Sequence, residues 1–70
     1  MDQAAAEILA DAGRRRKRDE TVESAVGQAV RRKGLVFQDY VRVMSLLREE
    51  AKSRGVSVER ALKAISREEQ

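Results

Sequence analysis

Five consecutive cations near the start of this 70-residue chain form its densest run of charge. They are Arg14, Arg15, Arg16, Lys17 and Arg18. Guanidinium groups donate paired hydrogen bonds to phosphate oxygens, and several cations together gain affinity for nucleic acid by releasing its condensed counterions. Three more cations would join the same surface if the chain folds back at Gly34; they are Arg31, Arg32 and Lys33. This pattern predicts a surface that binds phosphates.

Other roles for the basic run stay open. From Gly13 to Thr21 the chain has no apolar residue, so this segment is expected outside the core as a solvated connector or an exposed helical turn. Its charge could be neutralised by the acidic first helix and by Glu20 and Glu23. The same composition could encode a nuclear-localisation signal. We favour phosphate binding over an inert surface.

The sequence gives little support for catalysis. It lacks His and Cys, which removes the usual general base, the thiol nucleophile, disulfide bonds and the commonest metal ligands. Each carboxylate pair lies among cations, as expected of a solvated helix surface; the pairs are Asp19/Glu20, Glu49/Glu50 and Glu68/Glu69. No glycine-rich phosphate loop of the GxxxxGK[ST] or GxGxxG type is present. We therefore expect no enzyme activity, no cofactor and no metal site.

The two aromatic residues bear on the kind of nucleic acid. Phe37 and Tyr40 fall on an apolar helical stripe and are expected in the core, so they would not stack on single-stranded bases. Contacts would then go to the backbone of a duplex or of structured RNA. We expect DNA rather than RNA.

The central element is predicted as a helix over residues 36–54. Its main stripe contains Phe37, Tyr40, Val41, Met44, Leu47 and Ala51, at steps of three and four residues. A β alternative exists because LVF and YVRVM suit strands, but the helical pattern continues unbroken through SLLREEA. Further apolar residues beside the stripe predict a contact surface, either a homodimer seam or a groove for a partner helix. Its expected residues are Val36, Val43, Leu46 and Leu47.

The other elements are also predicted as helices. Residues 1–13 form a short weak helix ended by Gly13, and residues 14–19 form a basic connector. Residues 20–70 form a three-helix core, with helices at about 20–33, 36–54 and 58–67. The predicted fold is all-α, a small bundle of three to four short helices that dimerisation completes.

The segment from Ala51 through Gly55, Val56 and Ser57 to Ala61 resembles the helix-turn-helix pattern over about twenty residues. The resemblance implies that the final helix could read a DNA groove through its exposed face. That face would carry Ser57, Glu59, Arg60 and Lys63, of which the two cations join the candidate nucleic-acid-binding residues. The chain departs from the pattern at Glu50 and Arg54, where that motif has apolar residues.

Composition bounds location and partners. Charged residues make up 39% of the chain and the net charge is +3, with the excess concentrated in residues 13–33. This charge-rich composition suits a thermophile, and its Arg and Ala content equally suits a GC-rich genome. No apolar run is long enough to span a bilayer, and the N-terminus is acidic where a signal peptide is basic. We expect a cytoplasmic protein without a membrane partner.

Two functions remain in competition. The first is a small basic helical nucleic-acid-binding protein, such as a transcriptional regulator or a nucleoid-type protein, acting as a homodimer. The second is a helical protein–protein interaction or assembly module whose central amphipathic helix engages a partner. Placement of residues 14–18 and 31–33 on one open face would favour the first. Pairing of those side chains with carboxylates would favour the second.

Overall fold

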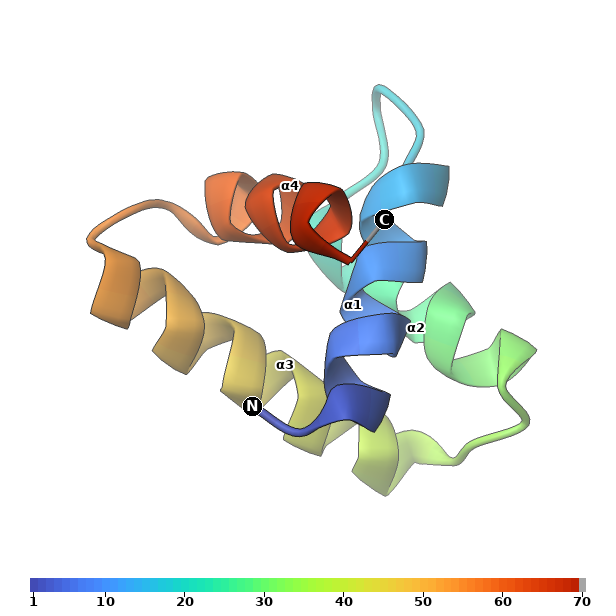
Figure 1. Cartoon of the computed structure of the whole chain (residues 1–70). Coiled ribbons are helices and arrows are strands. Elements are labelled where there is room, and N and C mark those ends of the chain that lie inside the picture. The colour runs from blue at the N-terminus through green and yellow to red at the C-terminus, as the bar shows by residue number, and fades with distance from the viewer. Residues whose placement is uncertain (70) are drawn as a thin grey trace.

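A computed structural model describes residues 1–69, which form four helices and no strand (Figure 1). The helices are α1 (Gln3–Arg15), α2 (Val22–Arg32), α3 (Phe37–Arg54) and α4 (Val58–Glu68). The all-α prediction is confirmed. Helices α2, α3 and α4 overlap the ranges 20–33, 36–54 and 58–67 expected from the sequence, while residue 70 of the expected core lies outside the described residues. No helix within residues 1–69 is long and apolar enough to cross a membrane.

Polar side chains define where the helices begin. Asp2, Thr21 and Ser57 each accept a hydrogen bond from a backbone N–H in the first turn of α1, α2 and α4. At the start of α3, the Asp39 carboxylate accepts the N–H of Val36 at 3.1 Å. These bonds satisfy backbone donors that have no partner within the helix.

Two glycines in the left-handed region end α2 and α3. Gly34 has φ 73° and Gly55 has φ 68°, a backbone conformation that residues with a Cβ rarely adopt. After Gly55 the chain turns back, and the N–H of Val56 donates to the carbonyl of Ala51 at 3.0 Å. This is the Schellman arrangement, and it leaves only a short connection between α3 and α4.

Helix α1 lies at the centre of the fold, where it packs along α4 and α2 (Figure 1). Its buried face consists of Ala5, Ile8, Leu9, Ala10 and Ala12. The helix expected over residues 1–13 is present, but it runs from Gln3 to Arg15, and its buried face does not fit the expectation of a short weak helix. The physical reason is that small alanine side chains allow neighbouring helices to approach closely, so α1 needs few large residues to be well packed.

Gly13 lies inside α1 and does not end it. A Cβ added at Gly13 would lie 2.7 Å from the Cβ of Ser66, so only glycine allows α1 and α4 to cross this closely. The helix continues through Arg14 and Arg15. The prediction of a basic connector over residues 14–19 is therefore wrong at its first two residues, and the loop covers residues 16–21.

The predicted contact surface on α3 is also partly wrong. Val43 and Leu47 are completely buried in the core of the single chain, because α4, α2 and α1 all pack against α3. Leu46 is partly buried against the same core, and Val36 is exposed.

Phe37 was expected in the core, but 74% of its surface is exposed. Helix α3 has 18 residues and α2 has 11, so α3 is longer by about 10 Å at a rise of about 1.5 Å per residue. The shorter helices cannot cover its whole length, and its first turn is left open. Tyr40, one turn further, packs partly against the core.

Candidate nucleic-acid interface

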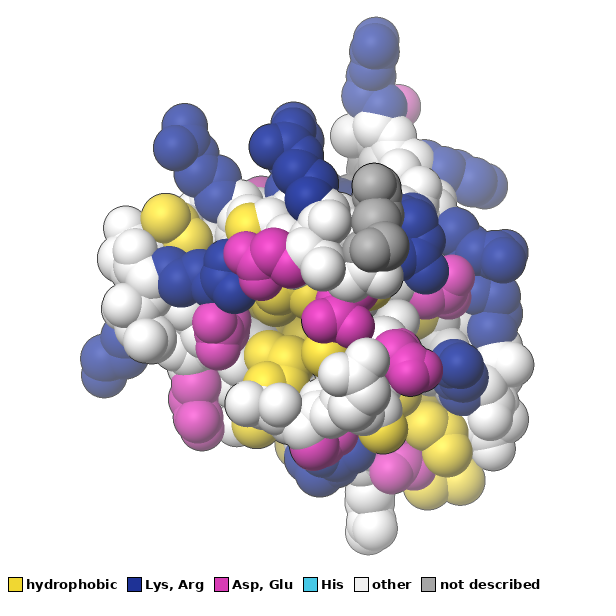
Figure 2. All heavy atoms as spheres, viewed as in Figure 1, with side chains coloured by type: hydrophobic (Ala, Val, Ile, Leu, Met, Phe, Trp, Pro, Cys, Tyr) yellow, Lys and Arg dark blue, Asp and Glu magenta, His cyan; other side chains and the backbone are white. Residues whose placement is uncertain are grey.

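Part of the basic run meets α4 in one hollow of about 420 Å³. This hollow, here named the basic groove, is lined by Gly13, Arg16, Lys17, Arg18, Glu59, Arg60, Leu62 and Lys63. Five of these residues are cations and one is a carboxylate. In Figure 2, Lys and Arg side chains gather along the upper edge of the molecule, over α4 and the loop that follows α1.

The close crossing at Gly13 positions the two walls of the basic groove. Because α1 and α4 touch there, the chain leaves α1 beside the first turns of α4. The loop then turns back through a hydrogen bond from the N–H of Glu20 to the carbonyl of Lys17 at 3.1 Å. The Arg16 Nε donates to the carbonyl of Glu20 at 2.8 Å. The basic loop is thus folded into a defined turn.

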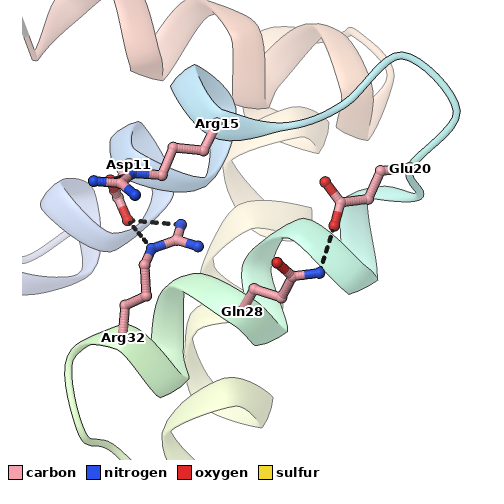
Figure 3. Close-up of polar contacts among 5 residues, drawn as sticks. All are labelled: Asp11, Arg15, Glu20, Gln28 and Arg32. Atoms are coloured by element: carbon pink, nitrogen blue, oxygen red, sulfur yellow. Dashed lines mark hydrogen bonds and ion pairs between the residues drawn. The ribbon is translucent and has the colours of Figure 1, made fainter.

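The side chain of Glu20 also stabilises this loop, through hydrogen bonds to the loop and to α2. Its carboxylate accepts the N–H of Lys17 at 3.1 Å, the hydroxyl of Ser24 at 3.0 Å and the amide of Gln28 at 2.8 Å (Figure 3). The backbone hydrogen bond from Lys17 is the largest cause that holds the pKa of Glu20 below its usual value. The Glu20 carboxylate is therefore engaged with the loop and α2, and within residues 1–69 it makes no ion pair with the cations.

Helix α4 forms the other wall. Ser57 caps its first turn through the N–H of Arg60 at 3.1 Å, and the exposed Arg60 and Lys63 follow one turn apart. Within the described part of the chain, none of the five cations of the basic groove forms an ion pair with a carboxylate. Their charge remains available to an external anion.

The other predicted cations lie in a second hollow of about 340 Å³, the mixed hollow. It is lined by Glu7, Ala10, Asp11, Arg14, Arg15, Arg32, Lys33 and Glu69. Here four cations face three carboxylates. The near balance of charge makes this hollow a weak site for a polyanion.

Asp11, which lines the mixed hollow, contacts both Arg15 and Arg32 (Figure 3). It accepts the Nε of Arg15 at 2.9 Å and both the Nε and a terminal nitrogen of Arg32, at 3.0 and 2.8 Å. Partial burial works against the charged form of Asp11, but the hydrogen bonds and charge of these two arginines outweigh it. Its pKa is therefore held below the usual value. The ion pair with Arg32 ties α1 to α2, whereas Arg15 lies in α1 with Asp11.

The predicted cations thus do not share one open face. Arg16, Lys17 and Arg18 lie with the α4 cations, whereas most of the others lie in the mixed hollow. Arg31 lines neither and lies at a third hollow. Gly13 was expected only to end the first helix, and its role in the close contact with α4 was not predicted; its position after an alanine-rich helical pattern was the available signal.

The helix-turn-helix resemblance departs at two residues that connect α3 to α4. Arg54 donates to Glu50 at 2.8 Å and, through both terminal nitrogens, to Glu68 at 2.7 and 2.8 Å. The hydrogen bond from Arg54 lowers the pKa of Glu68. One ion pair, Arg54 to Glu68, thus bridges α3 and α4, and the pair with Glu50 lies within α3, at positions where that motif has apolar side chains.

The third hollow, of about 590 Å³, lies between α2 and the start of α3 and is here named the apolar hollow. It is lined by Glu23, Ser24, Gly27, Gln28, Val30, Arg31, Leu35, Val36, Phe37 and Tyr40. The rings of Phe37 and Tyr40 stack with centroids 5.8 Å apart. Phe37 is exposed, yet one of its faces is already covered by its neighbour.

Over residues 1–69, no group of three or more potential ligands is placed to hold a metal ion. No family model matches the chain, and neither curated proteins nor solved structures gave a significant match. The candidate function therefore depends on the geometry of the three hollows.

Proposed function

We propose that this protein binds the phosphate backbone of nucleic acid, with duplex DNA as the preferred ligand, through the basic groove. The observation that carries the proposal is the unpaired charge of this groove. Arg16, Lys17 and Arg18 on the loop face Arg60 and Lys63 on α4, with Glu59 as the only carboxylate in the lining. A dense set of unpaired cations is what a polyanion requires for counterion release.

The chemistry of the groove favours backbone contacts over base stacking. Its lining contains no aromatic side chain, and its three arginines can bind phosphate oxygens bidentately. Two of its cations lie in the first half of α4, so this helix could enter a DNA groove while the loop holds the adjacent backbone. A nucleoid-type protein is expected to bind duplexes of any sequence, whereas a transcriptional regulator is expected to prefer one sequence.

Salt titration of binding tests the proposal directly. Fluorescence anisotropy with a labelled duplex should give a plot of log K against log salt concentration with a slope of about −4.5, if all five cations meet phosphates. Lys63→Gln or Arg18→Gln should weaken binding to all duplexes and reduce the magnitude of the slope by about 1 each. Lys52→Gln and Arg48→Gln are matched controls, since both residues are exposed on α3 outside the three hollows.

Two results would contradict the proposal. One is no binding to duplex DNA or RNA at low salt. The other is an equal loss of affinity for the groove variants and the α3 controls, which would mean that only net charge matters. Duplexes of different sequence, compared in the same assay, separate a nucleoid-type protein from a regulator.

The alternative function is a protein-interaction module, and the apolar hollow is the observation that favours it. In that case, neutralising Arg16, Lys17 and Arg18 would weaken a protein complex while nucleic-acid affinity stayed negligible throughout. A homodimer is part of the leading proposal, because a pair of chains would present two basic grooves to one duplex.

A further inference from the structure

We propose that a second copy of this chain covers the apolar hollow, giving a two-fold dimer in which α2 packs against α2 of the partner subunit. This inference specifies the interface of the homodimer named in the proposed function, and its evidence is independent of nucleic-acid binding. It rests on exposed apolar surface, on a recess at Gly27 and on the charges at the two ends of α2.

The exposed apolar surface is concentrated in one short segment. Of the six exposed large hydrophobic residues within residues 1–69, four fall between positions 35 and 41. They are Leu35, Val36, Phe37 and Val41, with 39%, 64%, 74% and 47% of their surface exposed. A full Phe side chain contributes about 150–200 Å². The segment thus reaches the few hundred Å² at which exposed patches usually mark an interaction site.

The surface around the apolar hollow carries both a small recess and an exposed aromatic side chain. Gly27 lines it without a side chain, and an added Cβ would lie 3.8 Å from the ring of Tyr40, in ordinary contact and without a clash. The glycine therefore leaves a recess in α2 beside the ring of Tyr40. The exposed Phe37 lines the same hollow. One surface thus holds both a protrusion and a recess, which a two-fold interface requires because each chain presents the same surface to the other.

Two charged residues of α2 indicate that the partner at the apolar hollow is a second copy of this chain. Glu23 and Arg31 both line the apolar hollow, both are exposed, and neither forms an ion pair within residues 1–69. They lie four residues before and four residues after Gly27, on the same side of the helix. If two copies of α2 cross antiparallel at Gly27, Glu23 meets Arg31 of the partner subunit, and the symmetric pair forms as well.

The proposed interface leaves the basic groove open. The apolar hollow and the basic groove share no lining residue. A stable interface buries about 800 Å² on each partner, which the exposed face of α2 together with residues 35–41 could supply. The dimer would use Val36 from the contact surface predicted from the sequence, without opening the core at Val43 or Leu47.

Charge reversal tests both the occupant and the arrangement. Sedimentation equilibrium should show a dimer for the unaltered chain. Glu23→Arg and Arg31→Glu each place like charges opposite one another, so each should raise the dimer dissociation constant about tenfold or more. The double variant restores opposite charges and should return the constant to within about threefold of the unaltered chain. Glu59→Arg and Lys63→Glu on α4 are matched controls that should leave it unchanged.

Phe37→Ser provides an independent test. It should dissociate the dimer with little change in the circular dichroism of the monomer, because Phe37 is mostly exposed. A monomeric unaltered chain at millimolar concentration would overturn the proposal and leave the hollow to another protein. A dimer that survives Phe37→Ser or either single reversal would also overturn it. Failure of the double reversal to restore the dimer would overturn the antiparallel arrangement.

Discussion

The crossing of α1 and α4 at Gly13 can be tested by adding one methyl group. In Gly13→Ala, the new Cβ would lie 2.7 Å from the Cβ of Ser66 and 3.1 Å from the carbonyl oxygen of Leu62, whereas ordinary contacts lie at 3.4–4 Å. Neither atom is the end of a flexible side chain. The helices themselves must therefore move apart.

The expected magnitude follows from two opposing effects. Alanine in a helix interior is favoured over glycine by about 1 kcal/mol. Forcing extra volume into a close-packed site costs about 1–3 kcal/mol, and here both contacts of Gly13 are too short. We expect the upper part of that range and a net loss of about 1–2 kcal/mol. For a domain of this size, Tm would fall by roughly 5–15 °C.

The matched control is Gly27→Ala in α2, where the nearest atom to an added Cβ is a Tyr40 ring carbon at 3.8 Å. The same chemical change should raise the free energy of unfolding there, by up to about 1 kcal/mol. Urea denaturation followed by circular dichroism at 222 nm measures both variants. The protein must be dilute enough that its stability does not vary with concentration, since Gly27 lies at the proposed dimer contact.

A second substitution shows whether Ser66 is the obstacle. Ser66→Gly removes the Cβ at 2.7 Å and should recover part of the loss caused by Gly13→Ala, giving a favourable coupling energy in a double-mutant cycle. A Gly13→Ala variant at least as stable as the unaltered chain would refute the close crossing. It would also remove the basis for the position of the basic groove.

Three further predictions concern stability and the loop. Leu9→Ala should reduce the free energy of unfolding by about 3 kcal/mol in urea denaturation, because Leu9 is completely buried, and a loss below about 1 kcal/mol would show that α1 is peripheral. Four carboxylates have pKa values below their usual range; they are Asp2, Asp11, Glu20 and Glu68. As the pH falls, these carboxylates bind protons in the unfolded state before they do so in the folded state, so Tm should fall progressively below about pH 5. Because the chain has no His, Tm should be nearly constant from pH 5 to 8. A Tm that stays constant down to pH 3 would contradict this prediction. Glu20→Ala removes the acceptor and should speed hydrogen exchange at the Lys17 amide, whereas unchanged exchange would show that Glu20 does not hold the loop.

Local signals in the sequence were enough to place α2 and α4. Ser57 precedes an apolar pattern with the helical period. In the structure Ser57 caps α4, and the buried face of α4 follows that pattern. The left-handed turn at Gly55 was equally readable, because a glycine after a helical run is the usual terminator. These features depend on neighbouring residues, so tertiary contacts did not alter them.

The role of α1 could not be predicted in the same way. Small residues such as Ala10 and Gly13 contribute little to an apolar count, and their value appears only when another helix lies against them. Underestimating α1 had a consequence for α3. Val43 and Leu47 were assigned to an interface because no other cover was expected, while Phe37 was assigned to a core that does not extend to the first turn of α3.

The candidate site depends on how the fold distributes its carboxylates. Glu20 lies only two positions after the basic run, yet its carboxylate accepts hydrogen bonds from the backbone of its own loop and from α2. Asp11 meets Arg32 across 21 positions, a pairing set by the packing of α1 on α2. Within residues 1–69, neither carboxylate forms an ion pair with Arg16, Lys17 or Arg18. A chain with a net charge of only +3 can therefore gather five unpaired cations in one groove, a concentration that a linear count of charge cannot reveal.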